Sequence, residues 1–238
     1  RKTLTKRISQ KTAKILMRLI ALVLGLLFLE ILIIHSKNEQ QKSVSNQVQT
    51  ARIMANGDLL YHDGLYMSAL QADGSYDFTE NFTYVKPWLK QADLVLGDFE
   101  GTINPDYPLS GYPLFNAPQS VTAAIKDAGY DVMDLAHNHI LDSGLEGAFT
   151  TADAFKEVGI DPVGVYENPV RDKAPLFIKN VNGIKVAILS YAYGYNGLES
   201  NLTDKEVADH LSNLDEKRMK AEIQRAEKEA DITVIMPQ

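Results

Sequence analysis

The chain has no cysteine among its 238 residues. Disulfides and thiolate metal sites are therefore excluded, and a metal ion would need oxygen or imidazole ligands, which suit Mn, Mg or Zn. The sequence also lacks a basic patch with interleaved aromatic side chains, and its formal net charge is -7, so nucleic acid is not an expected partner. It lacks repeats of solenoid period, and one large domain is the expected organisation.

A long apolar run lies near the N-terminus, where seven basic residues fall within the first 18 positions. At about 1.5 Å per residue, the span 15–34 is long enough to cross a bilayer. The positive-inside rule keeps the basic flank in the cytoplasm. We therefore expect a cytoplasmic basic tail at 1–14 and a transmembrane signal anchor at 15–34, with everything after it on the extracytoplasmic side of the cell membrane.

A cleaved signal peptide is the alternative interpretation of this run, but residues 33–37 lack a small-x-small cleavage site. A buried soluble helix is disfavoured because no polar stripe interrupts residues 19–29. Residues 35–51 are polar and rich in Gln, which predicts a tether. A globular domain is then expected over residues 52–238.

Two predicted strands of this domain end in carboxylates. The runs 52–58 and 92–101 each contain a short apolar strand that closes on Gly-Asp, at Asp58 and at Asp98, and Glu100 follows the second. Ligands of open α/β sheets bind in the crevice outside the carboxyl ends of the strands. These side chains are therefore expected at one ligand-binding edge.

A third strand-like run, 131–135, delivers Asn138 and His139 into a turn before a helix that starts near Gly144. An amide oxygen can ligate a divalent cation, and a neighbouring imidazole can donate a proton to an oxyanion on that cation. Alone, this turn would be read as an Asn-rich turn with a half-buried His. Together with the two Gly-Asp ends, it predicts a site for a divalent metal and a phosphate.

The pair Gly57-Asp58, the segment 97–101 and the segment 136–144 resemble successive motifs of the CapA (PgsA) poly-γ-glutamate capsule proteins, a branch of the calcineurin-like metallophosphoesterases. The resemblance runs from about residue 52 to residue 238. It implies an α/β fold, a calcineurin-like four-layer α/β/β/α sandwich. From the break at Gln238 and the apolar run we expect this sandwich to be truncated and to be preceded by one N-terminal transmembrane helix.

Roles for individual residues follow from the resemblance. It implies that Asp58 binds a first metal, that Asp98 bridges two metals, and that Asn138 binds the second. His139 would face the phosphate as the catalytic residue. The capsule branch commonly reads Asn-Leu-Glu in the second motif, so Asp98 stands in place of an amide and its carboxylate should favour a cation. Glu100, which matches the Glu of that motif, joins the expected ligands.

Two departures from the family pattern also matter. The first motif of metallophosphoesterases usually reads Asp-x-His, but the nearest imidazole after Asp58 is His62, which is interpreted as a helix-start or surface residue. A further His is expected just after the strand 231–236, where the chain has Pro237-Gln238 and ends. The last histidine motif is therefore expected beyond residue 238, in a missing C-terminal part.

The remaining segments are expected to be scaffold. Apolar spacing predicts helices at 120–128 and 147–158, and 211–230 is expected as a charged surface helix. The aromatic and Gly-rich loop 191–197 is expected either to line a polymer groove or to form a packed turn. Asp142 is interpreted as a helix-start cap.

Two functional classes remain open. The first is a membrane-anchored component of poly-γ-glutamate capsule synthesis or export, whose partners would be an anionic polymer such as poly-γ-glutamate, other membrane subunits of a capsule synthesis complex, and the membrane. The second is a metal-dependent phosphoesterase that acts on a cell-envelope phosphate ester. The enzyme needs a complete histidine set, and the sequence leaves open whether the site is catalytic.

Overall fold

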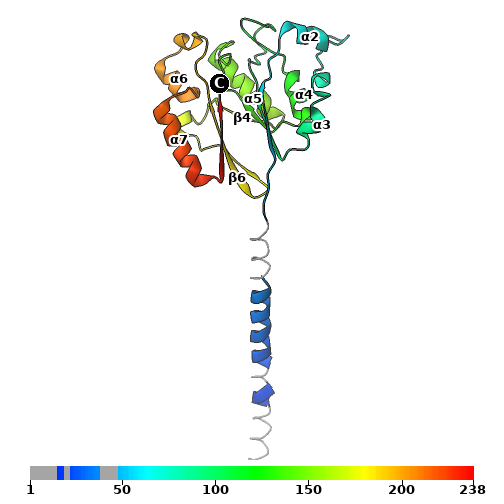
Figure 1. Ribbon diagram of the computed structural model, residues 1–238, viewed down its shortest axis with the longest axis vertical. Helices are drawn as coiled ribbons and strands as arrows, with labels where there is room; N and C mark the ends of the chain where they lie inside the picture. Colours follow the sequence, from blue (N-terminus) through cyan, green and yellow to red (C-terminus); the bar gives the residue numbers. More distant parts are fainter. Residues whose placement is uncertain (1–14, 19–21, 38–47) are drawn as a thin grey trace, which may run out of the picture. The chain divides into compact units, whose positions relative to one another are not determined.

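The computed structural model describes residues 15–18, 22–37 and 48–238. The chain divides into two units, Arg1–Val48 and Gln49–Gln238. The first unit contains the 23-residue helix Ile15–Lys37, drawn in blue in Figure 1, which is long and apolar enough to cross a membrane. By length and composition it is a candidate membrane span or signal anchor. The predicted basic tail, and residues 38–47 of the predicted tether, lie outside the described residues.

The second unit begins with a parallel sheet of the order β1-β2-β3-β4. Its strands are β1 (Ile53–Asp58), β2 (Leu94–Asp98), β3 (Val132–Asp134) and β4 (Asp161–Val163). The first three confirm the strands predicted from short apolar runs. β2 and β3 are buried along their whole length, as expected of central strands covered on both faces.

Helices cover the outer face of this sheet. α4 (Ser120–Ala128) and α5 (Gly144–Glu157) share a buried apolar cluster with β2 and β3, in which Val95 and Met133 meet Ile125 and Phe155. The observed α4 has the predicted bounds, and α5 begins at Gly144 as the turn motif predicts. The shorter helical segments before α4 are α2 (Asp63–Ala69), η1 (Thr79–Phe82) and α3 (Lys86–Leu89).

The second sheet contains β5 (Ile178–Val181), β6 (Ile184–Tyr191) and β7 (Ile232–Pro237). β5 and β6 form an antiparallel hairpin, and β7 runs parallel to β6. The hairpin turns at Asn182 and Gly183, with φ angles of 53° and 88°. Both angles are positive, which is the requirement of a type I′ turn and explains the Asn-Gly pair.

One helix of the C-terminal part packs on the outer face of the second sheet. Ala226 of α7 (Glu216–Glu229) is buried with Leu189 and Tyr191 of β6. The charged surface helix was predicted to begin at residue 211, but Asp215 accepts a hydrogen bond from Arg218 N and caps α7 there. The other helical segments of this part are η2 (Arg171–Lys173), η3 (Leu198–Asn201) and α6 (Asp204–His210).

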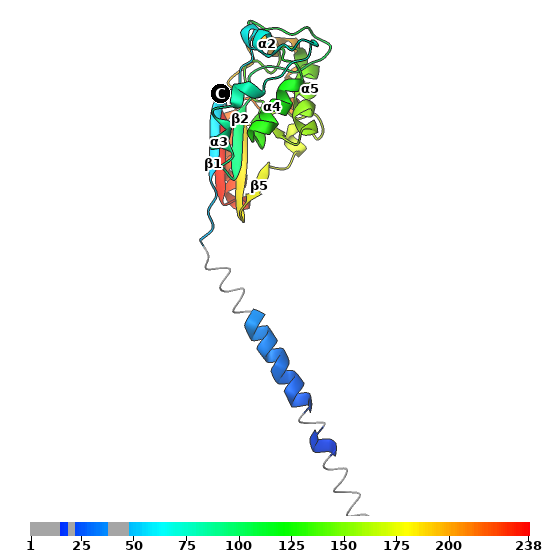
Figure 2. The same cartoon turned by 90° about the vertical axis from the view of Figure 1, so that its right-hand side faces the viewer.

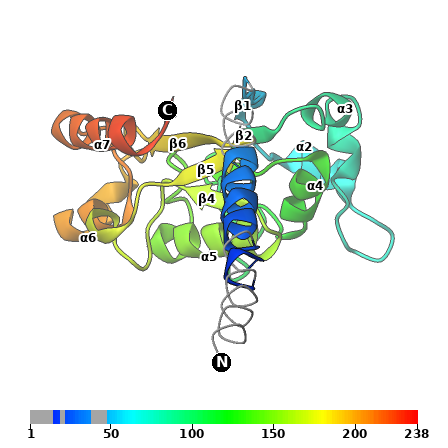
Figure 3. The same cartoon turned by 90° about the horizontal axis from the view of Figure 1, so that it is seen from below.

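The two sheets pack face to face. Leu96 and Val132 of the first sheet are buried in one cluster with Val186 and Ile188 of the second. Figures 1 and 3 show α4 on one side of the sheets and α7 on the other, and Figure 2 looks at the domain from the side on which α3 and α4 lie. The domain is therefore the predicted four-layer α/β/β/α sandwich, with the carboxyl ends of β1 to β3 at one edge.

Candidate functional site

The carboxyl ends of β1, β2 and β3 bring three aspartates into a row. Asp58 is the register partner of Asp98, and Asp98 is the register partner of Asp134. Asp98 and Asp134 are buried, whereas Asp58 is exposed. Glu100 lies just after β2, close enough to Asp58 to share a hydrogen bond. We call Asp58, Asp98, Glu100 and Asp134 the carboxylate cluster.

The cluster holds more acidic groups than its surroundings can keep ionised. Burial and the neighbouring carboxyls raise the pKa of Asp98 to about 8. Burial and the hydrogen bond with Asp58 raise the pKa of Glu100 to about 7. Burial also raises the pKa of Asp134 to about 7, against the lowering effect of hydrogen bonds from Ser190 and Ala136. Like charges at close range have this effect, and a bound cation would relieve it.

Asp98 has an additional feature that points to a cation. Its Oδ1 atom is buried and has no hydrogen-bond partner. Buried polar atoms are nearly always paired, so a carboxylate oxygen that lacks a partner and lies among other carboxylates suits a positively charged ligand. In the part of the chain that the structure describes, no three His, Asp or Glu side chains are already arranged as a metal-ligand group. The donor chemistry nevertheless fits a hard divalent cation.

His139 lies beside the cluster and is held by a carboxylate. Its Nδ1 atom is 2.7 Å from Oδ2 of Asp142, and its Nε2 atom is 3.9 Å from Oε1 of Glu100. The imidazole also meets the Phe115 ring edge to face, with centroids 4.8 Å apart. Because Asp142 holds one ring nitrogen, the other is directed toward the cluster, as the metal and phosphate prediction requires.

The interpretation of Asp142 as a helix cap is wrong. Ser143 occupies the N-cap position of α5 and makes no side-chain cap hydrogen bond. Asp142 instead accepts a 2.6 Å hydrogen bond from Phe115 N with the same oxygen that meets His139. A carboxylate three residues after a His, within a tight turn, was the sequence signal for this pairing.

Asn138 is oriented by a residue from the other sheet. Its Nδ2 atom donates a 3.2 Å hydrogen bond to Oδ1 of Asn196. Asn196 Nδ2 in turn lies 3.4 Å and 3.5 Å from the two ring nitrogens of His139. Asn196 belongs to the loop after β6 and has a φ of 55°, a left-handed conformation that Asn tolerates. From the sequence, the loop 191–197 was expected only to line a polymer groove or to form a packed turn, so the role of Asn196 beside Asn138 and His139 was missed.

Two other histidines have structural roles. His137 is fully buried, and its Nδ1 accepts a 3.1 Å hydrogen bond from His139 N. Burial lowers the pKa of His137 to about 3, so the ring stays neutral and shapes the turn. His62 is the N-cap of α2 and accepts a hydrogen bond from Asp63 N. The interpretation of His62 as a helix-start residue is confirmed.

Comparisons with known proteins point to one family. The family model described as bacterial capsule synthesis protein PGA_cap matches residues 52–238. The capsule biosynthesis protein CapA of Bacillus anthracis is 36% identical over 115 residues, which cover 46% of this chain and 28% of that protein. The PGA biosynthesis protein CapA of Bacillus subtilis is 26% identical over 191 residues, which cover 79% of this chain and 49% of that protein. The chain thus spans less than half the length of these curated relatives.

A solved structure from Staphylococcus aureus, described as a candidate 5'-nucleotidase, matches with a TM-score of 0.49 and 12% identity. The match covers 79% of this chain and 37% of that one. At this level of similarity it carries no argument about the site, and the fold assignment stands on the layers and core clusters of the chain itself.

Proposed function

Because this chain belongs to the bacterial capsule synthesis protein family over residues 52–238, we propose that it is a membrane-anchored, extracytoplasmic component of poly-γ-glutamate capsule synthesis or export. The names of its two Bacillus relatives support capsule and polymer synthesis as the process. The apolar helix Ile15–Lys37 supports the anchor. The basic N-terminal flank supports an external domain, through the positive-inside rule.

The observation that carries the proposal is the carboxylate cluster with its orphaned Asp98 oxygen. Asp58, Asp98 and Glu100 would hold a divalent cation, together with the carbonyl oxygen of Asn138. Such a cation would supply the positive charge that a polymer of carboxylates needs in order to approach an acidic domain. His139 Nε2 would donate a hydrogen bond to the same anionic group.

Binding of poly-γ-glutamate to the full chain in nanodiscs of zwitterionic lipid tests this role. We expect binding in the presence of Mn and its loss in excess chelator. Asp98→Asn should weaken Mn binding by about ten-fold or more, whereas Asp106→Asn, an exposed loop carboxylate, should not change it. Polymer binding that persists unchanged in chelator, or equal Mn affinity in the two variants, would exclude the cation-mediated role.

A second candidate function is metal-dependent phosphoester hydrolysis. It is favoured by the His139–Asp142 pair, because a carboxylate on Nδ1 leaves Nε2 able to protonate a leaving oxygen while water attacks phosphorus. The test is release of p-nitrophenol from bis(p-nitrophenyl) phosphate in Mn. Activity that falls at least 100-fold in His139→Gln, a typical general-acid effect, would favour the enzyme. Polymer binding without any turnover would favour the capsule component alone.

A further inference from the structure

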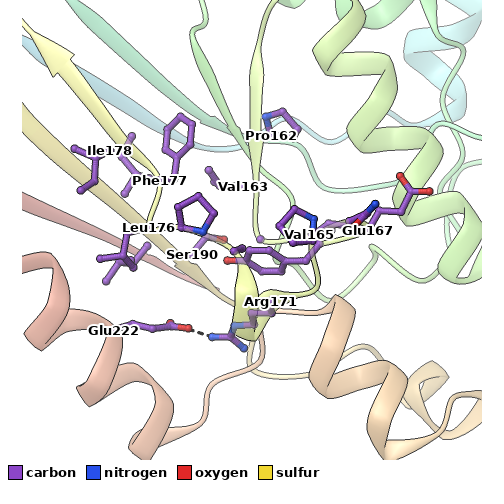
Figure 4. Close-up of a pocket in the computed structure, with 18 of the residues that line it drawn as sticks. Pro162, Val163, Val165, Glu167, Arg171, Leu176, Phe177, Ile178, Ser190 and Glu222 are labelled. Carbon is purple, nitrogen blue, oxygen red and sulfur yellow. Dashed lines mark hydrogen bonds and ion pairs between the residues drawn. The ribbon is translucent and has the colours of Figure 1, made fainter. Parts of the chain in front are cut away.

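The cavity beside β4, β6 and α7 is an internal space of the domain (Figure 4). Val163 and Phe177 form part of its apolar wall, and at its charged end Arg171 Nη2 lies 3.1 Å from Glu222 Oε2. The apolar side chains of this wall are directed to the inside of the domain. A group of apolar side chains at α3 is directed to the outside, and nothing in the described part of the chain covers it.

This group lies on one helical turn. Tyr84 is 89% exposed, Val85 is 45% exposed and Trp88, the single tryptophan of the chain, is 66% exposed. Pro87 between them is exposed as well. We call Tyr84, Val85, Pro87 and Trp88 the α3 face. Apolar side chains that gather in solvent in this way mark an interaction surface, whereas a single exposed one does not.

The core of the domain does not account for the α3 face. The same segment is already fixed to the core by other side chains, since Phe82 is buried with its ring centroid 6.1 Å from that of Tyr130, and Leu89 packs against the main apolar cluster. The segment is therefore apolar on both of its sides. A helical segment that is apolar all round is expected to be covered all round, so the outer side needs a second apolar partner.

α3 lies beside the point at which the chain enters the domain. Arg52, which precedes β1, donates a 3.3 Å hydrogen bond from Nη1 to the carbonyl oxygen of Gln91, just after α3. Its own carbonyl oxygen accepts a 2.8 Å hydrogen bond from Asp93 N, just before β2. Residues 38–48 join the candidate membrane span Ile15–Lys37 to the domain, and a chain of this length spans at most about 40 Å. A bilayer crossed by that helix is thus within reach of this end of the domain.

We propose that the α3 face docks on the surface of the lipid bilayer, an inference that rests on the membrane anchor proposed above. Tyr and Trp rings suit the headgroup region because each has an apolar body and a polar O–H or N–H. Lys86, the charged residue within this segment, is paired with Asp127, so docking relies on burial of apolar surface. The carboxylate cluster follows β1 and β2, at the opposite ends of these strands from Arg52 and Asp93. Docking therefore holds the cluster away from the lipid.

Trp88 allows a direct test with the full chain in phosphatidylcholine liposomes, because it is the single tryptophan. Lipid that is brominated near the head of its acyl chains quenches tryptophan on contact, and we expect a loss of Trp88 fluorescence relative to liposomes of unbrominated lipid. Tyr84→Ser combined with Val85→Ser should restore most of the fluorescence and increase quenching by water-soluble acrylamide, because it removes much of the apolar area of the α3 face. Tyr107→Ser, at an exposed tyrosine of another loop, is the matched control and should change neither.

Retention of the chain on liposomes after an alkaline carbonate wash is measured in parallel. A chain that is washed off would refute the anchor and the docking together. A chain that is retained, with Trp88 open to acrylamide and unquenched by brominated lipid, would overturn the docking and leave the anchor intact. Trp88 that is shielded from both quenchers would assign the α3 face to a protein partner and would also overturn docking on lipid. Equal loss of fluorescence in the Tyr84→Ser, Val85→Ser double variant and in Tyr107→Ser would have the same consequence.

Discussion

At the scale of single residues, the site is defined by a buried carboxylate, Asp98, that lacks hydrogen-bond partners for one of its oxygens. Asp98 is buried between Asp58 and Asp134 in register, and one of its oxygens is unpaired. The sequence could predict Asp58, Asp98, Asn138 and His139, because each follows a strand end marked by turn residues. Asp142 was assigned the wrong role, because a carboxylate that lies between a His and a helix start can either cap the helix or pair with the His three residues before it, and the local sequence fits both.

The raised pKa values give the metal-free chain a defined pH dependence. Asp98 and Glu100 have pKa values of about 8 and about 7 when folded, against about 4 when unfolded. Between these values the folded state binds more protons than the unfolded state, so stability falls as pH rises. In chelator, the melting temperature should fall from pH 5 to pH 8, and Asp98→Asn should flatten the fall. A melting temperature that rises over this range would show that the carboxyl groups of the cluster do not have raised pKa values in the folded chain.

Asn196 offers a test of how Asn138 is positioned. Asn196→Ala removes the acceptor that fixes the Asn138 amide. If Asn138 is a metal ligand, Mn affinity should fall by about ten-fold, as expected when a partner of a ligand is lost. Asn201→Ala, at the end of η3, is the matched control and should leave titration calorimetry of Mn unchanged. Equal affinities in the two variants would remove Asn196 from the site.

At the scale of elements, the predictable parts were those with strong local patterns. β1, β2, β3 and α4 carry apolar runs or helical spacing, and they form where the sequence predicts. β4 and β5 were missed because Asp161-Pro162 and Lys179-Asn180 interrupt their apolar character. Both strands form through pairing with a neighbour, which no local pattern records.

Gly164 shows how closely the two sheets approach beside the site. Its φ is +95°, and a Cβ there would lie 2.7 Å from Ala136 Cβ and 2.8 Å from Ser190 Oγ. Gly74 has a similar φ of +86° but has nothing within 4 Å of its Cβ position. Gly74→Ala should therefore cost about 1 to 2 kcal/mol of backbone strain. Gly164→Ala should cost about 1 to 3 kcal/mol more, by overpacking.

Chemical denaturation of both glycine variants, with wild type alongside, measures the difference. Since both positions need a left-handed backbone, the difference between the two substitutions isolates the packing of Gly164 against Ala136, in the turn after β3, and against Ser190 of β6. Similar free energies of unfolding in Gly74→Ala and Gly164→Ala would mean that Ala136 and Ser190 can move away from residue 164 at little cost.

At the scale of the whole molecule, the family and the four-layer sandwich agree with the prediction. The membrane anchor and its orientation are proposed from the length and composition of the apolar helix and from its basic flank. Basic residues gather before the apolar helix, so the domain after it is more acidic than the net charge of -7 suggests. An acidic domain repels an anionic polymer, and contact must then be concentrated at a cation or at local basic groups. The position of the domain relative to the membrane decides which polymer it can meet.

Membrane topology is directly testable with protease on intact, wall-stripped cells that express the full chain. If the basic flank stays in the cytoplasm, protease should digest the domain and leave a fragment that contains the helix Ile15–Lys37. An epitope placed before Arg1 should remain protected until the cells are lysed, and it serves as the internal control for membrane integrity. A domain that resists protease in intact cells but is digested after lysis would place it in the cytoplasm. In that case the domain would lie on the opposite side of the membrane from an extracellular capsule polymer, and the carboxylate cluster would need a cytoplasmic ligand.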